Sequence, residues 1–132
     1  MIVADTNLIV YLFITGDQTL LAQKVLAKDA QWIAPPLWQS EFRSVLASYV
    51  RHGMTLLEAR QVMSDALQTL EKRQIIPSHE KILELIAESD CTAYDCEFVA
   101  LARQLSIQLV TADKQLLKRF PDCAVSLEEF VK

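Results

Sequence analysis

The stretch MIVADTNLIVYLF, residues 1–13, opens with a short apolar run that a single acidic residue, Asp5, interrupts. Residues 1–4 have the composition of a buried strand, and the apolar run from Leu8 to Phe13 is typical of a first helix. Asp5 therefore lies where a strand ends and a helix begins. In an α/β fold this point lies at the carboxyl edge of the sheet, where ligands bind.

The rest of the chain repeats this alternation of short apolar strands and amphipathic helices. In one helix Trp38, Phe42, Val45, Leu46 and Tyr49 are spaced by three and four, which predicts a shared buried face. Strands separated by helices predict a parallel sheet with helices on both faces, an α/β/α fold in one domain over residues 1–132. The predicted strands are 1–4, 32–34, 75–76, 107–110 and 124–125, and the predicted helices are 8–13, 20–27, 38–52, 55–72, 78–86, 92–106 and 114–120, with a short helix at the end.

Composition narrows the functional classes. The chain has 132 residues, is 52% apolar and carries a net charge of −4, so we expect a compact acidic domain without an obvious nucleic-acid-binding surface. Three cysteines without a CxxC pair argue against a zinc site or a disulfide framework. Asp5 interrupts the only apolar stretch that could serve as a leader, and no apolar run is long enough to span a bilayer. We therefore expect a cytoplasmic protein that does not bind membranes.

Four acidic residues are placed where an α/β fold would bring them together. Asp5 and Asp113 each follow a predicted strand, Asp95 lies in the first turn of a predicted helix, and Glu41 lies just over one turn into another. All four can reach one rim of a parallel sheet. The sequence therefore predicts an acidic cluster at that rim.

Three of these acids have a simpler interpretation as helix caps. Asp5 and Asp113 each precede a predicted helix, and Thr92 with Asp95 fits a capping box; each such role would stabilise the fold by about 1 kcal/mol. Glu41 has no such explanation, because it lies inside a helix at the edge of its apolar face. A half-buried carboxylate needs a partner, and either a cation or a lysine or arginine of another helix could supply it.

A divalent cation would resolve the repulsion within such a cluster. Carboxylates that crowd together without a counter-charge raise one another's pKa and destabilise the fold. Mg²⁺ prefers oxygen ligands and is commonly held by a few carboxylates together with substrate phosphate. The cluster is therefore suited to phosphodiester hydrolysis assisted by one or two metal ions.

The stretches Asp5-Thr6-Asn7, Glu41, Tyr94-Asp95 and Thr111-Ala112-Asp113 resemble, in order and spacing, the acidic motifs of PIN-domain nucleases, and among these the VapC-type toxins of bacterial toxin–antitoxin pairs. The resemblance implies a sheet of order 3-2-1-4-5 and cleavage of RNA that depends on Mg²⁺ or Mn²⁺ and leaves a 5′-phosphate. It also implies a homodimer and a cognate antitoxin as partner. Transfer, ribosomal and messenger RNA are all open as substrates.

Carried over residue by residue, the resemblance makes Asp5, Glu41, Asp95 and Asp113 the catalytic and metal-binding residues, with Asp5 and Asp95 as the most direct ligands. It implies that Asn7 and Thr111 orient these carboxylates through hydrogen bonds. Two basic residues near the motifs are candidates for substrate binding, namely Arg43 and Lys114.

Neighbouring residues are expected to have structural roles. Glu97 is two residues after Asp95 and should face away from the metal, solvated or ion-paired. Trp38 is expected in the core, which leaves no aromatic platform for stacking RNA bases. The apolar run Leu8 to Phe13 is expected to be core, with part of it forming a groove for the antitoxin.

Three alternatives compete with a nuclease. A response-regulator receiver needs an aspartate after the third strand, and the stretch RQIIPSHE, residues 73–80, contains none. A haloacid-dehalogenase-type phosphatase needs a DxDxT motif, whereas this chain has Asp5-Thr6-Asn7. A PIN fold that binds RNA or protein without cutting it is the remaining alternative, and an incomplete acidic set would favour it.

Overall fold

The fold is given by a computed structural model, which describes residues 1–70 and 73–132. The predicted elements occur in the predicted order, except that no strand forms at residues 75–76. The predicted end of the helix 55–72 lies outside the described residues. In chain order the elements are β1 (Ile2–Ala4), α1 (Thr6–Phe13), α2 (Thr19–Lys28), β2 (Trp32–Ile33), α3 (Leu37–Arg51), α4 (Leu56–Leu70), α5 (His79–Glu88), α6 (Ala93–Leu105), β3 (Leu109–Val110), α7 (Lys114–Arg119), β4 (Ala124–Val125) and α8 (Leu127–Phe130).

The strands form one parallel sheet in the order β2-β1-β3-β4. The predicted five-strand order 3-2-1-4-5 is wrong in one detail, because residues 75–76 do not form a strand. That segment contributes a single bridge beside β2, between Ala34 and Gln74. Pro35 and Pro77 lack the N–H group that a continued ladder needs, which explains why pairing stops there. The other four strands have the predicted relative order.

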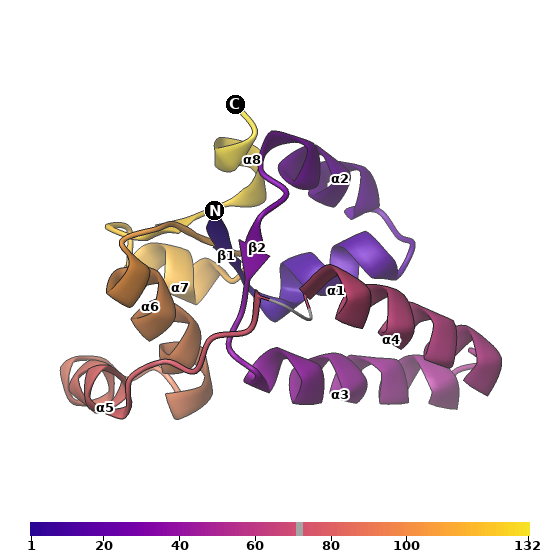
Figure 1. The fold of residues 1–132 in the computed structure, drawn as a ribbon, viewed down its shortest axis with the longest axis horizontal. Coiled ribbons are helices and arrows are strands. Elements are labelled where there is room, and N and C mark those ends of the chain that lie inside the picture. The colour runs from indigo at the N-terminus through magenta and orange to yellow at the C-terminus, as the bar shows by residue number, and fades with distance from the viewer. Residues whose placement is uncertain (71–72) are drawn as a thin grey trace.

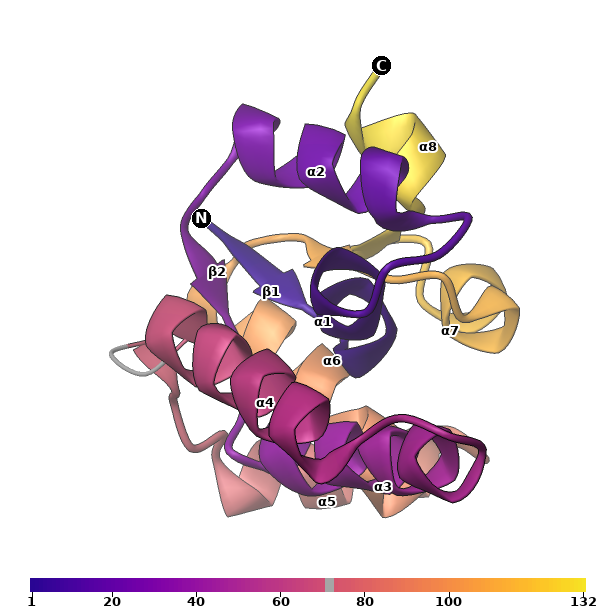
Figure 2. The ribbon, with the colours of Figure 1, turned by 90° about the vertical axis from the view of Figure 1, so that its right-hand side faces the viewer.

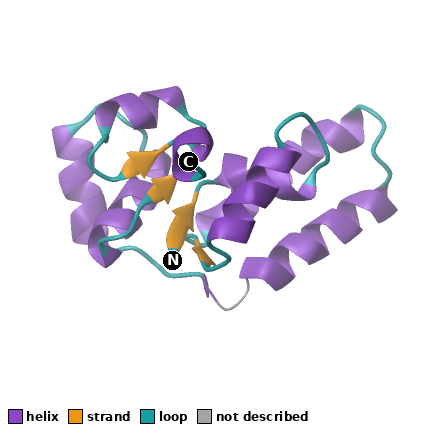
Figure 3. Ribbon diagram, turned by 90° about the horizontal axis from the view of Figure 1, so that it is seen from above, coloured by secondary structure: helices purple, strands orange, loops and turns teal. Residues whose placement is uncertain are grey.

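Helices cover both faces of this small sheet. Figure 1 shows α5 and α6 on one side of the strands and α1, α2 and α4 on the other. The quarter-turned view shows α3 and α4 as an antiparallel pair that crosses below α1 (Figure 2). From above, the strands lie side by side with this pair extending away from them (Figure 3). None of the helices in the described ranges is long and apolar enough to cross a membrane.

Local sequence signals set the helix boundaries. Gly53 follows α3 with a φ of 116°, a conformation that glycine adopts without steric cost. Among the described residues, side chains that accept a hydrogen bond from a backbone N–H in the first turn begin six of the helices. These N-cap residues are Asp5, Thr55, Ser78, Thr92, Asp113 and Ser126.

The core is built around the strands and the apolar faces of the helices. Val3, Ala4, Leu109 and Val110 are fully buried, as is Trp38 on α3. Within the stretch Leu8 to Phe13 the first two residues are fully buried and the others are partly buried against the core. This packing holds the carboxyl ends of β1 and β3 next to each other, where Asp5 and Thr111 follow.

Candidate active site

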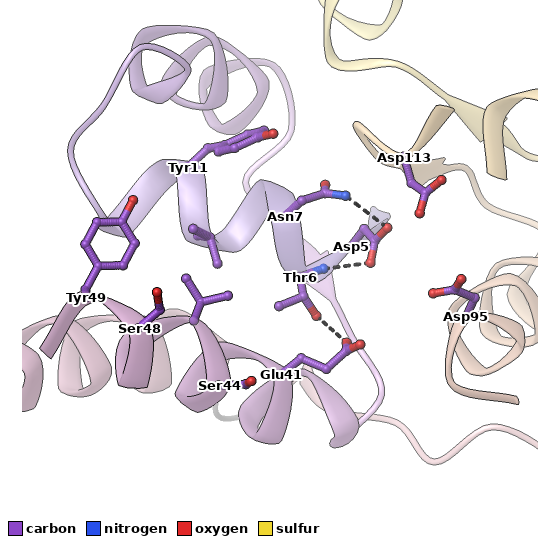
Figure 4. A pocket seen from close by; sticks show the side chains of 12 residues that line it. Asp5, Thr6, Asn7, Tyr11, Glu41, Ser44, Ser48, Tyr49, Asp95 and Asp113 are labelled. Atoms are coloured by element: carbon purple, nitrogen blue, oxygen red, sulfur yellow. Dashed lines mark hydrogen bonds between the residues drawn. The ribbon is translucent and has the colours of Figure 1, made fainter. Parts of the chain in front are cut away.

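An open cleft of about 690 Å³ lies at the carboxyl ends of β1 and β3. The predicted acidic residues form one end of it, and the cleft continues between α1 and α3 (Figure 4). The structure thus brings together four side chains that are as much as 108 positions apart in sequence. The lining residues are Asp5, Thr6, Asn7, Val10, Tyr11, Glu41, Ser44, Val45, Ser48, Tyr49, Asp95 and Asp113.

Asp5 is the most enclosed of the four acids, with only 7% of its surface exposed. Its Oδ1 caps α1 by accepting the Thr6 N–H at 2.8 Å, and its Oδ2 accepts from the Thr111 hydroxyl at 2.6 Å. The pKa of Asp5 is raised to about 6, mainly by burial. The two hydrogen bonds act against this and lower the pKa, whereas the charges of Glu41 and Asp95 raise it further. Asp5 is therefore both the predicted cap and part of the acidic cluster.

Asn7 and Thr111 connect the two strand ends. The Asn7 amide donates at 3.3 Å both to Oδ2 of Asp5 and to the Thr111 hydroxyl oxygen. Its Oδ1 accepts the Ala112 N–H at 3.1 Å, and Thr111 also accepts the Asp113 N–H at 2.9 Å. Both side chains thus make the contacts needed to orient Asp5 and the loop that carries Asp113.

Glu41 projects from α3 toward the same end of the cleft and is partly buried. Its Oε1 accepts the Thr6 hydroxyl at 2.7 Å. Among the described residues neither a lysine nor an arginine pairs with it, so its partner is the Thr6 hydroxyl and not a basic side chain. Burial raises the pKa of Glu41, the Thr6 hydrogen bond lowers it, and the charge of Asp95 raises it further.

Asp95 and Asp113 approach the cleft from the other side, each from the start of a helix. Thr92 caps α6 by accepting the Asp95 N–H at 3.1 Å, and Asp113 caps α7 by accepting the N–H groups of Gln115 and Leu116. Burial raises the pKa of Asp95, and the charge of Asp113 raises it further. Asp113 is therefore both a cap and a member of the cluster, whereas at the start of α6 the cap is Thr92 and the Asp95 carboxylate is left to the cleft.

The donor set fits a hard divalent cation in its chemistry. Four carboxylates with oxygen donors face one space, and burial and mutual repulsion raise the pKa of three of them. A bound cation would relieve that repulsion. Within residues 1–70 and 73–132, no three His, Cys, Asp or Glu side chains are close enough, as they stand, to hold a metal ion. Binding would therefore need the carboxylates to move closer together.

Residues 2–122 match the sequence model of the PIN domain. The chain belongs to the PIN-domain family. It is 24% identical over 124 residues to Ribonuclease VapC3 of Pyrobaculum aerophilum, covering 91% of this chain and 95% of that protein. Its fold is similar to the crystal structure of PAE2754 from Pyrobaculum aerophilum, with a TM-score of 0.77 and 18% identity over 98% of this chain and 85% of the other. The α/β fold with its parallel sheet is thus confirmed as a PIN fold.

Three charged residues near the motifs of this PIN domain do not line the cleft. Arg43 is exposed and its guanidinium donates to the Ser40 hydroxyl at 3.2 Å, and Lys114 is exposed at the start of α7. Glu97 does not line the cleft either; it is partly buried and therefore only partly solvated. Burial and the charge of Glu41 raise its pKa, and His79 lowers it.

Some cleft residues of the PIN domain were not singled out from the sequence. Thr6 holds Glu41, and one face of α3 extends from Glu41 through Ser44 and Ser48 to Tyr49. The prediction that Tyr49 belongs to the core is wrong, since it is 45% exposed. The sequence contains a signal for this face, because Ser44, Ser48 and Tyr49 follow Glu41 by three, seven and eight residues, a spacing that places them on one side of a helix.

Proposed function

We propose that this PIN domain is a metal-dependent endoribonuclease that hydrolyses RNA phosphodiester bonds. The observation that carries the proposal is the meeting of Asp5, Glu41, Asp95 and Asp113 in one cleft at the carboxyl edge of the sheet. The similarity to a ribonuclease, VapC3 of Pyrobaculum aerophilum, supports the same substrate class. A complete acidic set favours an enzyme over a PIN fold that only binds RNA.

The four carboxylates would hold Mg²⁺ or Mn²⁺, which would supply positive charge at the scissile phosphate and make water a better nucleophile. Thr111, Asn7 and the Thr6 N–H keep Asp5 in place through hydrogen bonds, and the Thr6 hydroxyl does the same for Glu41. Asp95 lies across the cleft in the first turn of α6, and Asp113 directly precedes α7. The chain's own contribution is thus a cluster of four carboxylates, two of them held by hydrogen bonds, beside a space open to a phosphodiester.

The biological role that we propose is that of a toxin in a toxin–antitoxin pair, which inhibits translation in the cytoplasm by cleaving a structured RNA. The proposal rests on the resemblance of the four acidic motifs to VapC-type toxins, and it includes a cognate antitoxin and a homodimer. An antitoxin that brings a basic side chain to the acidic end of the cleft would complement its charge. Arg43 and Lys114 remain candidates for contacts with RNA phosphates outside the cleft.

Cleavage of total bacterial RNA by the purified protein tests the activity. Reactions contain Mg²⁺, Mn²⁺ or EDTA, and the Asp95→Asn variant, purified in parallel, controls for contaminating nucleases. Glu84→Gln is the matched control, since Glu84 is an exposed acid on α5 outside the cleft. Discrete fragments that require metal, persist with Glu84→Gln and disappear with Asp95→Asn are the expected result, and their ends identify the target RNA.

Either of two outcomes would contradict a nuclease. Equal cleavage by wild type and Asp95→Asn would indicate a contaminant. An absence of cleavage with both metals, in a protein whose circular dichroism shows a folded domain, would favour the non-catalytic scaffold.

A further inference from the structure

Two tyrosines lie at the end of the cleft remote from Asp95 and Asp113. Tyr11 comes from α1 and Tyr49 from α3, and both side chains border the opening (Figure 4). Tyr49 is 45% exposed and Tyr11 is partly buried. Neither phenol hydroxyl has a hydrogen-bond partner among the described residues, although Tyr11 packs against the core. The cleft thus has an acidic end and an aromatic end.

The surface between the two ends is neutral. Val10 and Val45 are the apolar side chains that line it, and Ser44 and Ser48 add small hydroxyls. Of the described residues that line the cleft, none is a lysine, arginine or histidine. The aromatic end therefore has no side chain that could neutralise a phosphate, whereas it can take up flat, uncharged groups.

We propose that Tyr11 and Tyr49 bind nucleobases of the substrate RNA, each by stacking of its ring on an unpaired base. This inference rests on the proposed function, because it takes the acidic end as the place of the scissile phosphate. An RNA strand cut there runs along the cleft with its bases toward the apolar floor and its phosphates toward solvent. Base-paired RNA cannot offer its bases in this way, since they are already stacked in the helix.

The form of the cleft favours a single RNA strand over a peptide segment as the occupant. The aromatic end and the acidic end are parts of one continuous depression, so a ligand bound at one end extends to the other. Successive nucleotides provide flat bases for the tyrosines and a phosphodiester for the acidic end. Stacking is also tolerant of sequence, because every base has an aromatic face.

Binding of a short fluorescent single-stranded oligoribonucleotide tests the inference without relying on turnover. The dissociation constant is measured by anisotropy in EDTA and in Ca²⁺, and a gel run afterwards verifies that the RNA is intact. An abasic strand of the same length serves as a second probe. The proteins are wild type, Tyr49→Ala, Tyr49→Phe and Tyr11→Leu, which keeps apolar volume at a partly buried position. Val50→Ala is the matched control, since Val50 is an exposed neighbour on α3 outside the cleft.

We expect Tyr49→Ala and Tyr11→Leu each to weaken binding by about tenfold, as for the loss of one stacked base. Tyr49→Phe keeps the ring, so this variant should bind the oligoribonucleotide like wild type, and so should Val50→Ala. The abasic strand should bind weakly to all the proteins. Melting temperatures identify any variant that has lost its fold. These expectations do not depend on cleavage, so a failed nuclease assay would leave them intact.

Three outcomes would overturn the inference. Equal binding by wild type, Tyr49→Ala and Tyr11→Leu would show that the tyrosines do not hold RNA, and a partner peptide would then be the better occupant. A Tyr49→Phe variant as weak as Tyr49→Ala would assign the contact to the hydroxyl instead of the ring. Tight binding of the abasic strand would mean that the protein holds only the backbone.

Discussion

The hydroxyl of Thr111 donates a hydrogen bond of 2.6 Å to Oδ2 of Asp5, although the two residues are 106 positions apart in the chain. Their proximity follows from the sheet, because β1 and β3 are parallel neighbours in which Ala4 pairs with Val110. The next residue of each strand is therefore fixed beside the other. A slip of one residue in this register would turn the side chains to the opposite face. The geometry of the candidate active site is thus set by strand pairing.

Replacing Thr111 by valine tests this hydrogen bond. The substitution keeps the shape of a fully buried side chain but removes a donor to Asp5 and an acceptor for the Asp113 N–H. We expect the free energy of unfolding at neutral pH to fall by about 1–3 kcal/mol, as for other buried polar groups that lose a partner. Urea denaturation measures the change. Thr111→Ser, which restores the hydroxyl, should recover most of it, and a valine variant as stable as wild type would contradict the assigned role.

The metal-free protein should become less stable as the pH rises through the titration of Asp5. Burial raises the pKa of Asp5 from its ordinary value of 3.8 to about 6. Between these values the folded state binds more protons than the unfolded state, so the free energy of unfolding falls as pH increases. The full effect of Asp5 is about 3 kcal/mol. Glu41 and Asp95 contribute in the same direction, because the pKa of each is also raised.

The Asp5→Asn variant isolates this effect. Asparagine is as good an N-cap residue as aspartate and does not ionise. In EDTA the variant should therefore match or exceed wild type in stability above about pH 6, and its advantage should shrink in acid, where Asp5 of the wild type is protonated. Urea denaturation across this pH range gives the difference. An advantage that does not change with pH would mean that the ionisation of Asp5 is not its cause.

The features that the sequence predicted correctly are those governed by local chemistry. Short apolar strands followed by Asp5 and Thr111 were recognisable because each strand is bounded by polar residues that end it. The prediction of an edge strand at residues 75–76 was wrong, because two adjacent apolar residues do not show that the neighbouring strand stops at Pro35. Tyr49 was misplaced for a related reason, since spacing defines a helix face but not what that face meets.

Mg²⁺ should stabilise the folded protein. An ion that binds only the folded state adds about 1.4 kcal/mol at tenfold its dissociation constant, which raises the melting temperature of a domain of this size by roughly 5 °C. The rise should be smaller near pH 5, where Asp5 must release a proton to bind the ion. Asp95→Asn should reduce this rise in melting temperature, whereas Glu84→Gln should leave it unchanged. Sodium chloride of matched ionic strength is the control, and an equal rise with sodium would indicate general screening.

Asp113 caps α7 and also lines the cleft. Its capping role and the role of its negative charge can therefore be tested separately. Asp113→Asn keeps an oxygen for the Gln115 and Leu116 N–H groups but removes the negative charge. We expect it to unfold like wild type, or at slightly higher temperature because Asp95 then has one like charge fewer nearby. Metal-dependent RNA cleavage should fall by about tenfold to a hundredfold, the usual range for residues that support a metal site.

Asp113→Ala removes both roles, so it should lose cleavage to the same extent and also about 1 kcal/mol of stability. The comparison of melting temperatures with cleavage rates for the two variants distinguishes the interpretations. If Asp113→Asn cleaved RNA as wild type does while Asp113→Ala did not, the loss would follow from the uncapped helix. Asp113 would then be a structural residue at the rim of the cleft, and the metal would have to be held by Asp5, Glu41 and Asp95 alone.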